Sequence, residues 1–210
     1  LFSSQIIPNR GSWLEFETDS NTVLYVKINR QRRIYLSTFI RALALGGGTD
    51  EGIYQMFGED ERLRKTIEKD DKIKTVSQAR KEIYKHLKPG ETRVDEEEAR
   101  KYLESLYFDG ARYDLARVGR YKINKKLGIA VRIQGLTAAE TVIAPATGEI
   151  LVEENEIITE DTALRIENSG VSGLTVIKDD KKVRVLGNRF VDAHCYLSFD
   201  PEEIGLNEHV

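Results

Sequence analysis

The hydrophobic pattern of this chain changes period twice, and this change constrains its fold more than any other feature. Residues 1–30 alternate as strands do, with Leu14 and Phe16 on one face. Residues 35–108 carry apolar side chains at helical spacing, and residues 136–210 return mostly to the strand pattern. The sequence therefore predicts an α+β fold, in which a mixed lobe of helices and a β-hairpin precedes a small all-β module.

Turn and capping residues mark the ends of the expected elements. The turn "TDSN" at 18–21 predicts a hairpin between the strands around it. Thr49 and Thr159 are suited to cap helices at their N-termini, and Asp95 with Glu98 three residues later resembles a capping box.

The charge of the chain also changes along its length. Residues 101–135 carry eight basic and three acidic side chains, whereas residues 136–210 carry six basic and fifteen acidic ones. Because this shift coincides with the change of period near Leu136, we expect one domain over 1–135 and a second over 136–210. Any contact with a polyanion is expected on the first domain.

Catalytic and metal-binding patterns are not found in the sequence. His86, His194 and His209 are scattered, and His194-Cys195 has no second cluster at metal-ligand spacing. We therefore expect no catalytic residue, no cofactor and no metal site in this chain. No apolar run reaches the roughly 18 residues that span a bilayer, so no membrane partner is expected. One cysteine suits a reducing cytoplasm.

Two basic stretches and one tryptophan are the best candidates for a binding surface. "NRQRR" at 29–33 follows a strand, and "RVGRYKINKK" at 117–126 interleaves cations with Tyr121. Cations neutralise phosphates and aromatic faces stack on bases, so these stretches suggest nucleic-acid binding. A plain solvated basic face is an equally simple explanation, and Trp13 could instead belong to the core.

Five blocks of sequence resemble the β subunit of bacterial DNA-directed RNA polymerase over about residues 1–128. They occur in the order "IIPNRGSWLEFETD", "INRQRR", "IRAL", "EIYKHLKPGE" and "LYFDGARYDLARVGRYKINKKL". The resemblance implies the β lobe, one wall of the downstream DNA channel. It also implies that the chain is part of a longer polypeptide and that the lobe is incomplete.

The resemblance assigns roles to particular positions. Trp13 matches a tryptophan that faces the DNA cleft and stacks on an unpaired non-template base, and Arg120 matches an arginine that lines the same region. Asn29 stands where the family usually has Asp, and Glu96 stands where some members have an arginine contact. The role of Asn29 is therefore open, and the contact at Glu96 is not carried over.

The implied function is that of a non-catalytic fragment of a nucleotidyltransferase. The whole polymerase uses Mg²⁺, which binds elsewhere. The implied partners are the downstream duplex and non-template strand of DNA, the α, β′ and ω subunits, and sigma factor. The implied location is the bacterial cytoplasm, at the nucleoid. The candidate DNA-binding residues are Trp13, Arg30, Arg32, Arg33, Arg117, Arg120 and Lys122, with Lys125 and Lys126 as further phosphate contacts.

Residues 136–205 resemble a different element, a lineage-specific insertion of the sandwich–barrel hybrid type. The run "AETVIAPATGEILVEENEIITEDTALRI" carries this resemblance. Its acidic charge disfavours DNA and favours protein docking. The alternative function is therefore a protein-interaction module that docks sigma factor, other subunits or regulators without binding DNA itself.

Overall fold

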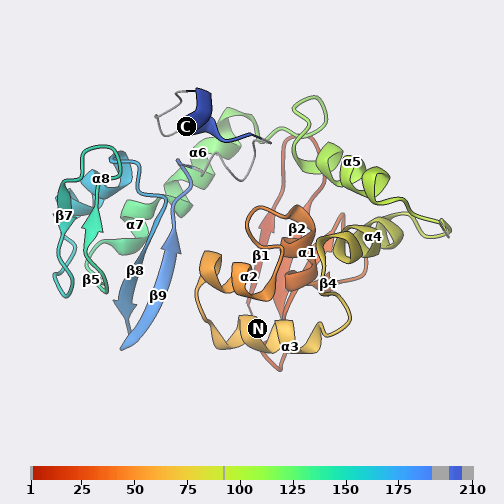
Figure 1. Ribbon diagram of the computed structural model, residues 1–210, viewed down its shortest axis with the longest axis horizontal. Helices are drawn as coiled ribbons and strands as arrows, with labels where there is room; N and C mark the ends of the chain where they lie inside the picture. Colours follow the sequence, from red (N-terminus) through yellow and green to blue (C-terminus); the bar gives the residue numbers. More distant parts are fainter. Residues whose placement is uncertain (1, 92, 191–198, 205–210) are drawn as a thin grey trace. The chain divides into compact units, whose positions relative to one another are not determined.

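The computed structural model describes residues 2–91, 93–190 and 199–204 and divides the chain into two compact units (Figure 1). Unit 1 is Leu1–Gly119 and unit 2 is Arg120–Val210. Helices and antiparallel sheets occur in both units, which confirms the α+β class. The division lies earlier than the boundary expected after residue 135, because α7 (Ile129–Ile133) packs into the core of unit 2.

Unit 1 is built on a four-stranded antiparallel sheet in the order β1-β2-β3-β4. Its strands are β1 (Ser3–Ile6), β2 (Leu14–Thr18), β3 (Leu24–Ile28) and β4 (Ile34–Tyr35). The predicted hairpin is confirmed, since β2 pairs with β3 from Leu14 opposite Ile28 to Thr18 opposite Leu24. Asp19 closes its turn by accepting hydrogen bonds from the N–H groups of Asn21 and Val23 at 2.9 Å each.

Five helices complete unit 1. They are α1 (Leu36–Leu43), α2 (Asp50–Phe57), α3 (Glu61–Lys69), α4 (Val76–Leu87) and α5 (Glu96–Tyr107). Helices α1, α4 and α5 share one core with the sheet, in which Val26, Phe39 and Ile83 are buried. A second core lies between α1, α2 and α3 and contains Ile53 and Ile67. These residues lie at the helical and strand spacings of the sequence, so the period of the pattern selects the buried face.

The described residues of unit 2 form two small antiparallel sheets and two core helices. The strands are β5 (Thr137–Ala138), β8 (Gly173–Lys178) and β9 (Lys181–Leu186) in one sheet, and β6 (Val142–Ile143) and β7 (Ile150–Val152) in the other. The described strands form no closed barrel. Helix α8 (Glu160–Asn168) is capped by Thr159 as predicted, and the Thr159 hydroxyl accepts the Thr162 N–H. A short 3₁₀ turn, η2, spans Pro201–Ile204.

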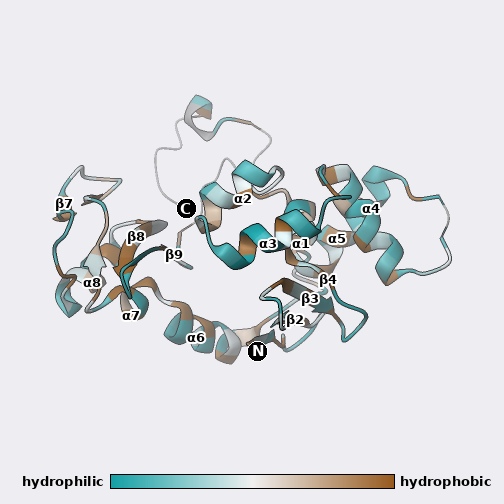
Figure 2. Ribbon diagram, turned by 90° about the horizontal axis from the view of Figure 1, so that it is seen from below, coloured by the Kyte–Doolittle hydropathy of each residue, from teal (hydrophilic) through white to brown (hydrophobic). Residues whose placement is uncertain are grey.

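Helix α7 belongs to the hydrophobic core of unit 2. In Figure 2 the short helix α7 is largely brown, and its Ile129 and Ile133 are buried against α8 and the sheets. The buried carboxylate of Glu167 on α8 accepts the Ala130 N–H at 2.9 Å and so satisfies a free donor at the start of α7. Arg189 pairs with the other oxygen of this carboxylate at 2.8 Å. The module is therefore α+β rather than all-β.

Candidate nucleic-acid interface

Trp13 lies at the end of a tight turn that leads into β2. The next residue, Leu14, is buried in the core, so the alternation of the strand directs the Trp13 side chain to the other face of the sheet. The indole is half-buried, and the guanidinium carbon of Arg30 lies 4.4 Å from the ring centroid. Such a cation–π contact fixes the plane of the ring and places a positive charge beside it.

Asn29 holds the backbone of this turn in place. Its side-chain oxygen accepts the Trp13 N–H at 2.8 Å, and its own N–H donates to the Trp13 carbonyl at 3.0 Å. The Asn29 amide nitrogen also donates to the hydroxyl of Ser12, at 3.2 Å. Both Asn29 and Arg30 have positive φ angles, of 51° and 60°, a conformation that Asn tolerates better than most residues.

The turn before Trp13 also contacts the segment that precedes the basic helix. The N–H of Arg10 donates to the Asp114 carbonyl at 3.1 Å, and the Asp114 N–H donates back at 2.8 Å. Gly11 has a φ of 122°, and a Cβ on it would lie 2.6 Å from the ring of Tyr113. Only glycine fits at this position, because the backbone lies so close to the Tyr113 ring. Two motifs about 100 residues apart in sequence are therefore joined within unit 1.

The other arginines of the 29–33 stretch lie on the same turn. Arg32 and Arg33 are exposed, and the guanidinium carbon of Arg33 lies 4.1 Å from the ring centroid of Tyr25. Tyr25 stacks in turn on Tyr35, with ring centroids 5.2 Å apart. Desolvation of Tyr25, together with the neighbouring Tyr35, raises its pKa above the ordinary value.

The second basic stretch forms a helix, α6 (Ala116–Leu127), that has no buried residue. The carboxylate of Asp114 accepts the Ala116 N–H at 3.0 Å and so fixes the start of this helix. Arg117 lies in unit 1, whereas Arg120 and Lys122 belong to unit 2, and all three are exposed. The remaining cations near the helix end, Lys125 and Lys126, are also exposed.

The structure thus brings together some of the candidate residues and adds others. Trp13 and Arg30 are in direct contact, and Arg32 and Arg33 lie on the same turn. Tyr25 was not among the candidates that the sequence offered, and Asn29 had no assigned role. An Asn placed directly after a strand and before an arginine run was the available signal for a left-handed turn.

Other kinds of site have little support. Among the described residues, no group of three or more His, Cys, Asp and Glu side chains could hold a metal ion. The pair His194-Cys195 lies outside the described residues, as does His209. No helix in the described ranges combines the length and the apolar character that a membrane crossing requires.

Comparisons with known proteins identify the family. The chain is 51% identical along its whole length to the DNA-directed RNA polymerase subunit beta of Clostridium botulinum (strain Loch Maree / Type A3), and 49% identical to those of Clostridium novyi (strain NT) and Clostridium tetani (strain Massachusetts / E88). It spans 17% of the length of each of these relatives. The sequence model of RNA polymerase Rpb2, domain 2, matches residues 1–161. This match covers unit 1 and the first part of unit 2, and it extends past the domain boundary expected after residue 135. The chain therefore belongs to the family of RNA polymerase Rpb2, domain 2.

Proposed function

We propose that this chain is the lobe of the β subunit of a bacterial DNA-directed RNA polymerase and that unit 1 contacts DNA in the downstream channel. The whole protein would then perform templated nucleotide transfer with Mg²⁺ bound outside this chain. Its partners would be the α, β′ and ω subunits and sigma factor, in the bacterial cytoplasm at the nucleoid. Two findings support this assignment: the family membership, and the similarity of the whole chain to one part of β subunits.

The contact between Arg30 and Trp13 is the observation that carries the DNA-binding role. With Arg30 over one face of the indole, the opposite face is the one on which an unpaired base of the non-template strand would stack. The exposed guanidinium groups of Arg32 and Arg117 would contact phosphates, which position a strand without reading its sequence. Arg120 and Lys122 would add further phosphate contacts along α6.

Trp13 is the single tryptophan of the chain, so its fluorescence reports on the proposed stacking directly. We expect a short single-stranded oligonucleotide to quench this emission at low salt, with an affinity that falls steadily as salt is added. Trp13→Ala should weaken binding of a labelled oligonucleotide about tenfold, within the range for loss of one base–aromatic stack.

Two control variants test whether DNA binding depends on Trp13 and Arg30 in particular, or on any exposed aromatic or positive side chain. Phe57→Ala removes an exposed aromatic ring from α2, and Arg64→Gln removes an exposed cation from α3. Both should leave binding unchanged, whereas Arg30→Gln should weaken it. Absence of binding even at low salt, or equal loss in Trp13→Ala and Phe57→Ala, would contradict DNA contact by this turn.

A protein-docking role is the second candidate, and the charge of residues 136–210 favours it. Residues 136–210 carry fifteen acidic and six basic side chains, which repel a phosphate backbone. If the oligonucleotide test fails while the chain still associates with other polymerase subunits, docking is the better description of its function.

A further inference from the structure

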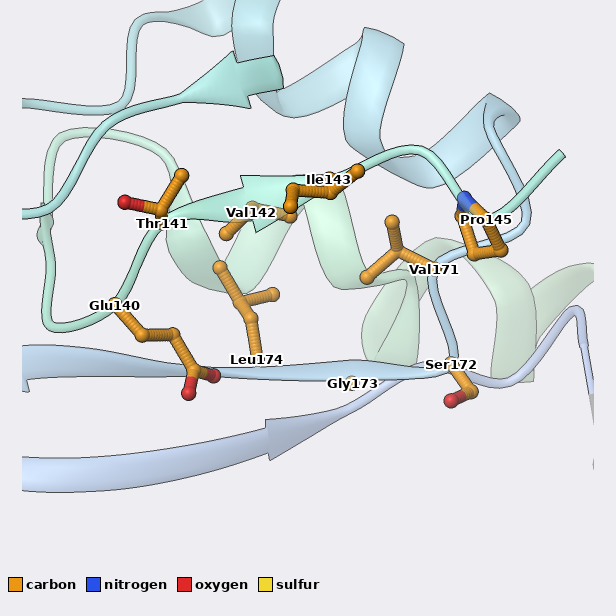
Figure 3. A pocket seen from close by; sticks show the side chains of 9 residues that line it. All are labelled: Glu140, Thr141, Val142, Ile143, Pro145, Val171, Ser172, Gly173 and Leu174. Atoms are coloured by element: carbon orange, nitrogen blue, oxygen red, sulfur yellow. The ribbon is translucent and has the colours of Figure 1, made fainter. Parts of the chain in front are cut away.

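Unit 2 has an open groove between β6 and the start of β8, and the proposed DNA contact does not use it. The groove encloses a volume of about 180 Å³. Figure 3 shows its apolar lining, in which Val142 lies opposite Leu174 while Pro145 and Val171 lie at one end. Glu140 lies at the other end.

Among the described residues, the start of β8 is paired with β9 on one side, at Gly173 opposite Leu186, and has no strand on the other side. The Ser172 carbonyl accepts the Gly187 N–H on the side of β9, and the Thr175 carbonyl accepts the Ala139 N–H on the opposite side. Because the direction of these groups alternates along a strand, the N–H and C=O of Gly173 point to the same side as those of Thr175.

Strand β5 ends before it reaches Gly173. Its last pair with β8 joins Ala138 to Val176, and beyond this pair the carboxylate of Glu140 accepts the Thr175 N–H at 2.7 Å. Within the described part of the chain, Gly173 has no strand beside it on this side. The edge is therefore open for one further strand, which would continue the line of β5.

The charge around the groove selects among possible occupants. The Glu140 side chain is 47% exposed, and its contact with Arg184 is long, at 3.8 Å. The exposed Glu154 follows closely, since its N–H donates to the hydroxyl of Thr141, which lines the groove, at 3.3 Å. The Glu140 carboxylate, in a part of the chain with an excess of acidic residues, repels nucleic acid and attracts a cationic ligand.

We propose that this groove binds an extended, basic segment of a partner protein by strand addition. The main chain of the segment pairs with Gly173, and its apolar side chains pack against the exposed Ile143 and Pro145. Its alternate side chains, which are Lys or Arg, face Glu140. This site lies in unit 2 and does not depend on DNA binding by unit 1.

The test uses the whole 210-residue chain and labelled heptapeptides. The first probe alternates Lys and Val, the second has Glu in place of each Lys, and the third has Pro in place of the central Val. We expect the basic probe to bind at least about tenfold more tightly than either of the others. It should also slow hydrogen exchange of the Gly173 amide, which simple charge attraction does not do.

Ile143 and Ile150 provide a matched pair of variants, because they are cross-strand partners with side chains of similar exposure, 51% and 53%. Only Ile143 lines the groove. Ile143→Lys should weaken binding of the basic probe about tenfold, and Ile150→Lys should leave it unchanged. Equal effects of the two variants would overturn the proposal.

Glu140→Gln tests the charge, because its amide oxygen can still accept the Thr175 N–H. We expect an affinity loss of about threefold, the size of an exposed ion pair. Glu149→Gln is the control, since Glu149 is also paired with an arginine, Arg165, but lies outside the lining. Equal binding of the basic and acidic probes, or no binding of either, would also overturn the proposal.

Discussion

Asn29 is the residue that links the fold to the proposed binding surface. Its side chain ties the Trp13 backbone and the Ser12 hydroxyl together, and its left-handed backbone turns the chain so that Arg30 lies over the indole. An aspartate could accept the Trp13 N–H in the same way. It could not donate to Ser12, and it would place a negative charge close to Arg30.

Two substitutions at Asn29 should weaken DNA binding for different reasons. Asn29→Ala removes both side-chain hydrogen bonds and disfavours the left-handed turn, so its deficit should persist as salt is raised. Asn29→Asp mainly adds charge, so its deficit should be largest at about 50 mM salt and shrink by about 200 mM, where screening is stronger. Quenching of Trp13 emission at the two salt concentrations measures both effects.

Asn21→Asp serves as the control for added charge, since Asn21 is exposed in the turn between β2 and β3. It should change binding much less than Asn29→Asp. If the two Asn29 variants show the same dependence on salt, then the separation of positioning from charge at this residue is wrong.

The sequence located Trp13 and Arg30 as candidates, but it did not indicate that they are in contact. That contact requires two residues with positive φ at Asn29 and Arg30, and hydrophobic patterning carries no information on such angles. The pairing of Arg10 with Asp114 was equally hidden, because it joins segments about 100 residues apart. Their roles toward DNA stay predictions.

At the scale of elements, capping residues in the sequence predicted several helix starts. Thr49 and Thr159 cap α2 and α8 as expected. Asp95 caps α5, but the reciprocal bond of a capping box is replaced, because Glu98 accepts the hydroxyl of Tyr84 at 2.5 Å. The full capping box lies instead at Thr75, which was not predicted from the sequence.

Helix α6 escaped prediction for a physical reason. Amphipathic patterning identifies a helix by the face that it buries, and α6 buries no residue. Its basic character was recognised from the sequence, whereas its secondary structure was not. Helix α7 was missed because five residues are too few to show a period.

Helices α1 and α2 are joined by an ion pair that should make unit 1 sensitive to acid. Arg41 is 1% exposed on α1, and it binds the carboxylate of Asp50, the first residue of α2. It also donates to the Gly48 carbonyl at 3.0 Å. Burial acts to raise the pKa of Asp50, but the hydrogen bond and charge of Arg41 outweigh it, so the pKa lies below the usual 3.8.

A carboxylate with a lowered pKa stabilises the fold when it is ionised, and this contribution is lost as pH falls through its folded value. Asp50→Asn should therefore lower the free energy of unfolding by about 2 kcal/mol at pH 7, the size of a charged hydrogen bond. The difference from the unchanged chain should narrow below pH 3.8. Chemical denaturation across this pH range measures it.

Asp71→Asn is the control, because Asp71 is exposed just after α3. It should cost little at any pH. A difference between Asp50→Asn and the unchanged chain that stays constant from pH 7 to well below 3.8 would show that Asp50 does not stabilise the fold through its charge.

At the scale of the whole molecule, the two units have separate hydrophobic cores. The core of unit 2 consists of residues between Ile129 and Val185, and the cores of unit 1 consist of residues before Gly119. The sequence anticipated two parts from the changes of period and charge. It placed the boundary later because the apolar residues of α7 are too few to assign to either part.

Separate cores predict that the two units lose stability independently. Ile133 and Ile83 are both fully buried, one in the core of unit 2 and the other beneath the sheet of unit 1. Each change to alanine should destabilise its own unit by about 2–5 kcal/mol, the cost of a core cavity. Ile133→Ala should therefore speed hydrogen exchange in β8 and α8 while β3 and α4 stay protected, and Ile83→Ala should do the reverse. Loss of protection in both units from either variant would mean that the chain unfolds as one cooperative body, because a cavity that weakens both cores requires coupling between them.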